Sequence, residues 1–430
     1  MSYNIYLTKP SSELYVGVLV SKQNLSFFTA IFCLIAIILS SCARSPIKGR
    51  EQALRPIRSK ILIQDDLQFF DFKNALEKNI SALKKSSQTH LFFGPVVVSK
   101  DMYIQKLEEL FHQIQTEPHF QNVEAWLNQN FVLFEVFGTK KWSEIFMTSY
   151  YEPIIEGSSS RTQKFSQPLY STPRDLVQIQ MNGFAARFPE LKIQQSTWRG
   201  RLVLKNEPPH EILPYYSRSE IDSPEKPLKK NSDIIAWVDP IDAFFLQVQG
   251  SGRVRLKDGK EILVNYASQN GHEYVAIGQF LFDAIPREKM SKHQIVNHLQ
   301  KLPPNERQEL LNRNPSYVFF RKSKQKAVTA FGTEAVAGRT IATDAKFFSK
   351  GALAFLEFDM PVFDSADSKE PSGFQKRQRL VFDQDVGGAI KGPGRVDLFW
   401  GSGPEAERYS GVIKNPGRLF YLVPKESVSM

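Results

Sequence analysis

The chain has 430 residues, of which 42% are apolar and 23% charged, so it is not a wholly disordered protein and has room for two or three domains. Its net charge of +10 favours anionic partners, but the basic residues are spread along the chain. The densest basic run, Lys226, Lys229 and Lys230, fits a solvated loop better than a nucleic-acid-binding patch. We therefore expect no nucleic-acid partner.

Both cysteines of the chain, Cys33 and Cys42, lie in its first tenth. The remaining chain can therefore hold neither a disulfide framework nor a cysteine-based metal site. It also has no Gly-rich phosphate loop and no cluster of metal-ligating side chains. We expect neither a cofactor nor a metal ion.

The segment before Cys42 has the features of a lipoprotein signal peptide. Lys22 precedes a short apolar run within Leu25 to Ser41, FFTAIFCLIAIIL, which suits a secretory signal better than a membrane span. The run ends in Leu-Ser-Ser-Cys at positions 39–42, which is the order of a lipobox. This predicts a signal peptide over residues 1–41 and lipidation of the Cys42 thiol, with an uncleaved signal anchor as the alternative.

Residues 42–60 are basic and contain Pro46 and Pro56, which predicts a tether between the lipid and the folded body. Several acyl chains on one cysteine anchor a protein stably. Ala43 follows the cysteine, and by resemblance to enterobacterial lipoproteins this favours the outer membrane. We therefore predict a protein held on the periplasmic side of the outer membrane of a Gram-negative bacterium.

Helical periodicity marks the first part of the body, and strands follow it. Apolar residues recur at helical spacing over 67–85, 98–114 and 123–131. Residues 131–137 and 144–151 are rich in aromatic and β-branched residues, which predicts strands.

The middle of the chain, residues 154–240, is rich in Pro and Ser and predicts loops with short strands such as 201–205. After it, the run DAFFLQVQ from Asp242 to Gln249 predicts a strand that turns at Gly250, Ser251 and Gly252 and pairs back. The remaining expectations are a strand over 262–266, helices over 274–284, 291–302 and 306–312, and short strands of a barrel from Tyr317 onward.

Two aspartates, Asp385 and Asp397, flank a turn-rich stretch near the C-terminus, and Leu398, Phe399 and Trp400 follow the second. A carboxyl group held against apolar and aromatic side chains has its charged form disfavoured, so its pKa rises and it can donate a proton near neutral pH. This makes Asp397 a candidate general acid. An edge-strand aspartate beside core aromatic residues would have the same local sequence.

The chain contains several long motifs. DVGGAIKG is followed by the aspartate at position 397 and then by GSGPEA, and the segments before them are SYYEP (149–153), PYYSRSEI (214–221), FFLQVQGSG (244–252), NGHEYVAIG (270–278), NPSYVFF (314–320) and GRTIATD (338–344). In this order the motifs resemble those of the membrane-bound lytic murein transglycosylase A family, and the first group resembles the family's C-terminal signature.

The resemblance implies a mainly β fold with N-terminal helices. It implies a double-psi β-barrel made of residues 61–153 and 314–430, with a second β-barrel domain, residues 154–313, inserted into it. The glycan strand would lie in a groove between the two domains.

The resemblance also implies a lytic exotransglycosylase, a carbon–oxygen lyase that cuts the β-1,4 bond between N-acetylmuramic acid and N-acetylglucosamine and leaves 1,6-anhydromuramic ends. The family's catalytic aspartate aligns with Asp397, although the loop before it is one residue longer than in the enterobacterial pattern. Asp385 and Asp344 match family aspartates with supporting roles.

Substrate binding is expected at residues near these motifs. Gln can bond sugar hydroxyls, small residues let a polymer approach the backbone, and an exposed aromatic ring stacks on a sugar. The candidates are Tyr150, Tyr151, Gln249, Gly250, Ser251, Gly252, Lys391 and Trp400.

The partners implied are the glycan strands, the outer membrane through the lipid, and cell-wall synthases or amidases. Two other functions stay open from the sequence: a glycan hydrolase on the same fold, in which Asp385 supplies a second carboxylate, and a glycan-binding lipoprotein without activity.

Overall fold

The computed structural model describes residues 47, 49–57, 61–117, 119–138, 141–193, 197–207, 209–225, 227–324 and 327–428. The predicted signal peptide, with the lipobox and Cys42, lies outside these residues. From Gly49 onward the chain belongs to one unit. Within the described ranges no helix combines the length and the apolar character needed to cross a membrane.

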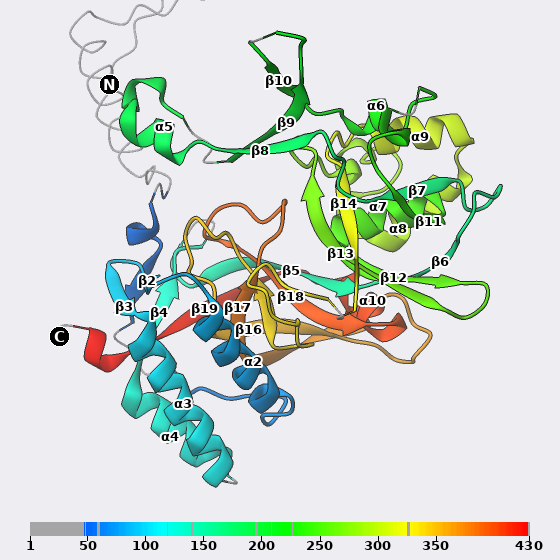
Figure 1. Ribbon diagram of the computed structural model, residues 1–430. Helices are drawn as coiled ribbons and strands as arrows, with labels where there is room; N and C mark the ends of the chain where they lie inside the picture. Colours follow the sequence, from blue (N-terminus) through cyan, green and yellow to red (C-terminus); the bar gives the residue numbers. More distant parts are fainter. Residues whose placement is uncertain are drawn as a thin grey trace, which may run out of the picture. The chain divides into compact units, whose positions relative to one another are not determined.

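Six strands close on themselves to form the main barrel (Figure 1). Their order is β19, β16, β17, β15, β18 and β5, and the additional pairing of β5 with β19 closes the sheet. The pairs β15–β17 and β18–β5 are parallel and the other pairs are antiparallel. The expected mainly β fold built on a barrel is confirmed. The strands are β5 (Glu144–Glu152), β15 (Thr340–Ala342), β16 (Ala352–Val362), β17 (Gly373–Asp385), β18 (Arg395–Ser402) and β19 (Lys414–Pro424).

Two more strands, β4 (Phe131–Val136) and β1 (Leu54–Pro56), extend the sheet beyond β19. A short helix, η1 (Arg50–Gln52), precedes β1, and Ala53 and Leu54 are buried. Part of the predicted tether is therefore folded. Its basic composition conceals this apolar pair, which packs into the body of the protein.

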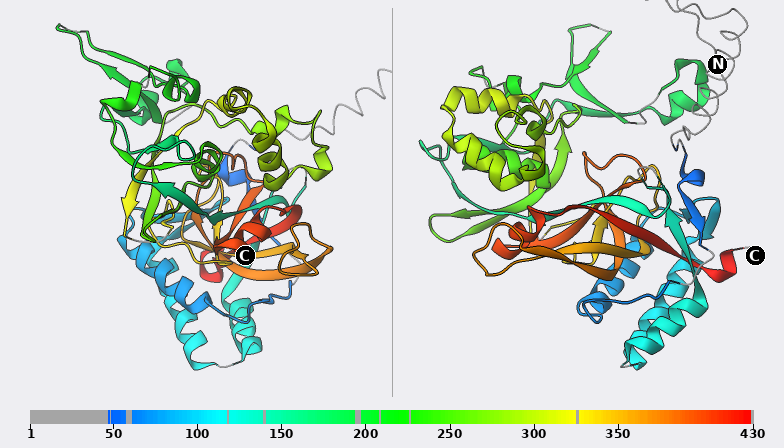
Figure 2. Two further views of the ribbon diagram at one scale, coloured as in Figure 1. Left: turned by 90° about the vertical axis from the view of Figure 1, so that its right-hand side faces the viewer. Right: turned by 180° about the vertical axis from the view of Figure 1, so that it is seen from behind.

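Three helices and a hairpin cover one side of the main barrel (Figure 2). The first helix packs on β17, where the rings of Phe72 and Phe382 stack with centroids 5.4 Å apart. It begins at Phe72 instead of residue 67, because Gln68, Phe69 and Asp71 have left-handed backbone conformations that a helix excludes. The elements are α2 (Phe72–Lys85), β2 (His90–Phe93), β3 (Val96–Ser99), α3 (Lys100–Thr116) and α4 (Phe120–Asn130).

A second six-stranded sheet is formed by the segment between β5 and β15, which we call the insert. Its order is β14, β13, β12, β6, β11 and β7, and one bridge between Ser171 and Phe320 joins its two ends. The predicted boundaries near Pro153 and Asn314 stay predictions, and β14 pairs with β13 in this sheet. The strands are β6 (Ile154–Ser158), β7 (Gln167–Tyr170), β11 (Ile234–Val238), β12 (Ser251–Leu256), β13 (Glu261–Gln269) and β14 (Val318–Ser323).

The insert also carries a three-stranded sheet and short helices. The expected strand over 201–205 is present only in part, since β9 ends at Val203, and the helices expected over 291–302 and 306–312 are present as α8 and α9. Ser291 caps α8 by accepting a hydrogen bond from the Gln294 N–H (3.3 Å). The elements are β8 (Leu176–Gln180), α5 (Asn182–Arg187), η2 (Pro189–Leu191), β9 (Thr197–Val203), β10 (Glu211–Pro214), α6 (Arg218–Ile221), η3 (Pro227–Lys229), η4 (Ile277–Phe280), η5 (Arg287–Lys289), α8 (Lys292–Lys301) and α9 (Pro304–Asn312).

The strand predicted over Asp242 to Gln249 is wrong, because this segment is the helix α7 (Pro240–Gln249). The Asp239 carboxylate caps it by accepting hydrogen bonds from the N–H groups of Ile241 (2.8 Å) and Asp242 (3.3 Å). Pro240 occupies the first turn, and Gly250, with φ +80°, ends the helix. These capping signals outweigh the apolar run, which by itself fits a helix or a strand.

The helix predicted over 274–284 is also wrong, since only η4 forms there. The Val275 N–H donates to Asn314 Oδ1 (3.1 Å), which ties this segment to the residue that follows the end of α9. In the C-terminal part, a helix that the sequence reading missed, α10 (Pro404–Ser410), follows Gly403, and η6 (Lys425–Ser427) ends the described chain. The strands β16, β17 and β19 have 11, 13 and 11 residues and are longer than expected.

The cap of α7 gives a stability prediction. Replacement of Asp239 by Ala removes the acceptor of two N–H groups, so the free energy of unfolding should fall by about 0.5–2 kcal/mol in chemical denaturation. The control is Asp283→Ala at an exposed position, which should change it by less than about 0.5 kcal/mol. Equal effects of the two changes would show that the cap does not stabilise α7.

Candidate active site

The register of the main barrel brings Asp385 and Asp397 to the two sides of one residue. Ala342 on β15 pairs with Asp385 on β17 and with Asp397 on β18. Asp397 pairs in turn with Thr148 on β5. Because neighbouring strands lie about 4.8 Å apart, the Cα atoms of the two aspartates are separated by about 10 Å. Four strands thus place these residues in one row.

Asp397 is partly buried, with 18% of its side chain exposed. Thr148 Oγ1 donates a hydrogen bond to Asp397 Oδ1, and Arg395 Nη2 lies 3.6 Å from the same oxygen and 3.1 Å from Thr148 Oγ1. Burial raises the pKa of the Asp397 carboxyl above its ordinary value, while the charge of Arg395 and the Thr148 hydrogen bond act in the opposite direction. A carboxyl of this kind can hold a proton and still be reached by a ligand.

Asp385 accepts three hydrogen bonds. Its Oδ2 accepts from the Tyr150 hydroxyl (2.8 Å), and its Oδ1 accepts from the N–H groups of Ala330 (2.9 Å) and Val386 (2.9 Å). Burial raises the pKa of its carboxyl, and these three bonds oppose the rise. The Asp385 carboxylate is therefore held in place by donors from three segments.

Tyr150 lies two residues after Thr148 on the same side of β5, and its hydroxyl donates to Asp385. Its ring contacts Phe399, with centroids 5.1 Å apart. Burial first, and then the charges of Asp385 and Asp397, raise the pKa of the Tyr150 hydroxyl well above its ordinary value. Tyr150 therefore stays protonated and acts as a donor at the site.

Tyr151 points to the other side of β5 and is buried, as the alternation of the strand predicts. Its hydroxyl donates to Glu407 Oε1 (2.9 Å) and accepts from Lys292 Nζ (2.5 Å). Lys292 also pairs with Glu407 at 2.6 Å. This group ties α8 of the insert to β5 and α10 of the main barrel.

The end of α7 positions the tyrosine pair. Gln249 Oε1 accepts a hydrogen bond from the Tyr151 N–H (3.0 Å). Ser251 and Gly252 are buried, and a Cβ at Gly252 would lie 2.9 Å from the Pro153 carbonyl oxygen. The small residues after Gln249 therefore allow close packing of the chain, and a role of Ser251 and Gly252 in letting a polymer approach the backbone stays a prediction.

The loop between the two aspartates is held by Asp344. Its Oδ2 accepts from the Gly392 N–H (2.8 Å), and its Oδ1 accepts from the Lys346 N–H (3.0 Å). The Gly394 carbonyl accepts from the Phe146 N–H (2.8 Å), which fixes the end of the loop to β5. Lys391 is an exposed side chain on this loop. Asp344 thus positions the segment that leads into β18.

Trp400 does not join the Asp397 group. Its ring stacks on Tyr409, with centroids 4.8 Å apart, and meets Phe358 edge-on. Its indole Nε1 is buried without a hydrogen-bond partner. Because the ring already packs on Tyr409, the exposed sugar-stacking surface expected here is not supported.

Three residues at or below the site were missed from the sequence. Thr148 and Arg395 contact Asp397, and each lies two residues from a residue already singled out, so strand alternation could have identified them. Below the site, Asp383 is fully buried and binds Lys350 Nζ at 2.7 Å and the hydroxyl of Tyr421 at 2.6 Å. No sequence signal separates this structural aspartate from Asp385.

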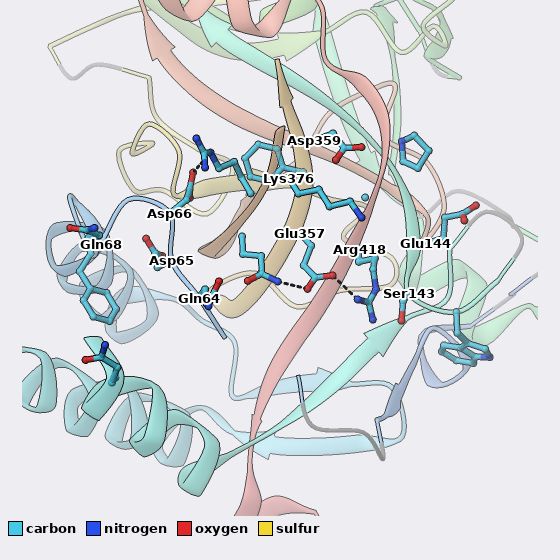
Figure 3. Close-up of a pocket in the computed structure, with 18 of the residues that line it drawn as sticks. Gln64, Asp65, Asp66, Gln68, Ser143, Glu144, Glu357, Asp359, Lys376 and Arg418 are labelled. Carbon is cyan, nitrogen blue, oxygen red and sulfur yellow. Dashed lines mark hydrogen bonds and ion pairs between the residues drawn. The ribbon is translucent and has the colours of Figure 1, made fainter. Parts of the chain in front are cut away.

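A cavity of about 1210 Å³ opens elsewhere on the main barrel, beside the ends of β16, β17 and β19 (Figure 3). Its wall includes Asp359, Lys376 and the ion pair of Glu357 with Arg418 at 2.6 Å. None of the predicted site residues lines this cavity.

Comparison with known proteins matches both parts of the chain. Residues 146–321 match the MltA specific insert domain, and residues 339–423 match the 3D domain. The membrane-bound lytic murein transglycosylase A of Escherichia coli (strain K12) is 30% identical over 290 residues, which cover 66% of this chain and 67% of that protein. The class is thus a 3D-domain protein with an inserted β domain.

Solved structures agree with the sequence matches. A membrane-bound lytic murein transglycosylase from Agrobacterium tumefaciens has a TM-score of 0.68 at 26% identity, over 87% of this chain and 98% of that one. The MltA of Neisseria gonorrhoeae has a TM-score of 0.60 at 26% identity, over 88% and 97%. The chain belongs to the membrane-bound lytic murein transglycosylase A family.

The contact of Arg395 with Asp397 predicts a pKa change. Replacement of Arg395 by Gln removes the positive charge that favours the carboxylate, so the pKa of Asp397 should rise further and its proton should be retained to higher pH. Carbon-13 NMR titration of labelled aspartates measures this. Lys391→Gln, which removes a charge from the same loop at an exposed position, is the control. An unchanged or lower pKa in Arg395→Gln would contradict the assigned contact.

Proposed function

We propose that this protein cleaves the β-1,4 bond between N-acetylmuramic acid and N-acetylglucosamine in peptidoglycan and forms 1,6-anhydromuramic ends. The observation that supports this proposal is the partly exposed Asp397, because burial raises the pKa of its carboxyl. Arg395 and Thr148 lie beside the same carboxyl and stabilise its carboxylate form. Membership of the transglycosylase family supports the substrate class.

In the first step the protonated Asp397 donates its proton to the glycosidic oxygen as the bond to C1 breaks. The muramic ring then has oxocarbenium character, and Asp397 is left as a carboxylate. Arg395, 3.6 Å away, and the Thr148 hydroxyl stabilise that carboxylate. These two groups thus make proton donation easier at the moment when it is needed.

In the second step the C6 hydroxyl of the muramic residue attacks C1, and the Asp397 carboxylate accepts its proton. One new bond, from O6 to C1, replaces the glycosidic bond, and Asp397 returns to its protonated form. One carboxyl serves both steps because they follow one another on the same side of the sugar. No water enters the balance.

The hydrolytic alternative needs a second carboxylate as base or nucleophile, and Asp385 is the candidate beside Asp397. Its position across Ala342 favours that alternative. However, Asp385 already accepts hydrogen bonds from Tyr150, Ala330 and Val386, which occupy three of the roughly four lone-pair sites of its carboxylate and hold it in place. We therefore assign Asp385 to holding Tyr150 and the loop that follows it, as a supporting aspartate.

The proposed place of action is the periplasmic side of the outer membrane, with Cys42 as the lipidated residue. The described body starts at Gly49, so seven residues of chain reach at most about 25 Å. A body on so short a tether would work on glycan strands close to the membrane. The lipobox and the name of the membrane-bound relative support this placement.

Mass spectrometry of digested peptidoglycan tests the proposal. The parent protein should release anhydromuramic ends, and Asp397→Asn should lower the rate by at least about a hundredfold, because it removes the acid and base together. The exposed Asp367→Asn serves as the control and should act like the parent.

Three outcomes would contradict the proposed reaction. Reducing muramic ends would identify a hydrolase. Full activity in Asp397→Asn would remove Asp397 from the mechanism, and inactivity of the parent with intact binding would identify a glycan-binding protein.

A further inference from the structure

Two arginines on β9 of the insert have guanidinium groups that are incompletely paired within the part of the chain that the structure describes. The Nε atoms of Arg199 and Arg201 are buried and have no hydrogen-bond partner, and within the described ranges neither guanidinium forms an ion pair. A buried N–H group without a partner costs free energy, so its presence calls for an acceptor. The two residues are two positions apart on one strand, so they share a face and lie about 7 Å apart.

This face is turned toward the body of the insert. Arg201 pairs with Leu176, which packs against the core around Tyr215, and its guanidinium lies 4.7 Å from the ring centroid of Tyr216. The charge of Arg199 acts on the exposed Tyr266 of β13. Both arginines are half-exposed, so a ligand can reach them.

Two carboxylates near β9 already have hydrogen-bond donors. Asp175 accepts from the Tyr215 hydroxyl (2.8 Å) and from Asn231 Nδ2 (3.1 Å). Glu220 accepts from the N–H (2.7 Å) and hydroxyl (2.6 Å) of Ser217 in the capping box of α6. The charge of Arg201 lowers the pKa of the Glu220 carboxyl, but within the described ranges neither arginine donates a hydrogen bond to these carboxylates, so the guanidinium groups can still bind an acidic ligand.

The segment 271–274 connects the arginine pair to the loop before Asp397. At one end, a Cβ on Gly271 would lie 3.0 Å from the Arg199 carbonyl oxygen. At the other end, a Cβ on Gly388 would lie 3.9 Å from the Tyr274 Cβ. The three residue steps from Gly271 to Tyr274 span at most about 11 Å. An extended peptide of four residues is long enough to cover the same distance between β9 and the loop before Asp397.

We propose that Arg199 and Arg201 bind the carboxylates of the stem peptide attached to the glycan strand. This rests on the proposed function, which supplies peptidoglycan as the substrate. Guanidinium groups match carboxylates with two parallel hydrogen bonds, and lysine does not reproduce this geometry. The pair thus makes the protein prefer glycan that carries peptides over glycan without them.

Binding is measured in the Asp397→Asn background, so that the substrate is not consumed. The probes are glycan strands with their stem peptides and the same strands after the peptides are removed by an amidase. With both arginines present, the Asp397→Asn protein should bind the peptide-bearing strands more tightly than the strands without peptides, by about tenfold or more. Arg199→Gln with Arg201→Gln in the same background should abolish this preference. Lys257→Gln, in an exposed turn of the insert, is the control that should keep it.

Two further measurements guard against a folding defect in the double variant. Arg199→Lys with Arg201→Lys keeps both charges and should retain only part of the preference. Added salt should weaken the preference of the unaltered arginine pair, because the contact is between charges at a half-exposed surface.

Equal binding of both strands by the parent, or an undiminished preference in the glutamine variant, would overturn the assignment of these arginines. A preference that salt does not change would also overturn it. Failure of the proposed function is distinguished by a different result. The protein that keeps Asp397 would then release no anhydromuramic ends from strands with or without peptides.

Discussion

The register of the closed main barrel is the constraint on which the site depends. Closure through the β5–β19 pairing fixes each strand between two neighbours, so Ala342 separates Asp385 from Asp397 and Thr148 lies beside Asp397. A slip of one residue in any of these strands would turn its side chain to the opposite face. The buried ion pair of Arg339 with Asp65 stabilises this arrangement, because it fastens the segment before α2 to the barrel strand β17 through the Leu380 carbonyl.

Within that row, opposing electrostatic effects define the chemistry. Burial favours the protonated form of Asp397, and Arg395 and Thr148 favour its carboxylate. A carboxyl that must donate a proton and then accept one needs its protonated form and its carboxylate form to be close in free energy. Asp385 differs because three donors fix it, and the hydroxyl of Tyr150, whose pKa the charges of both aspartates raise, donates to it and keeps its own proton. The two carboxyls therefore have different roles, although they lie on the two strands that flank β15.

The sequence predicted much of this, and the failures have physical reasons. Long motifs and the raised pKa expected at Asp397 agree with the fold and the site geometry. The run from Asp242 to Gln249 was misread because an apolar segment fits a strand or a helix, and the decisive cap at Asp239 lies outside it. Sugar stacking on Trp400 stays a prediction, and the stacking of its ring on Tyr409, which joins β18 to α10, is a contact that local spacing does not encode. Arg199 and Arg201 belong to no recognised motif, and they are distinguished by buried Nε atoms that stay unpaired among the described residues.

The most direct test of a single carboxyl acting without water is to run the reaction in water enriched in the heavy oxygen isotope. With the parent and with Asp385→Asn, the products should carry no heavy oxygen at C1 of the muramic ends, and the variant should react more slowly because Tyr150 loses its acceptor. Incorporation of one heavy oxygen at C1 by the parent would contradict the intramolecular attack. Complete loss of activity in a correctly folded Asp385→Asn would show that a second carboxylate takes part.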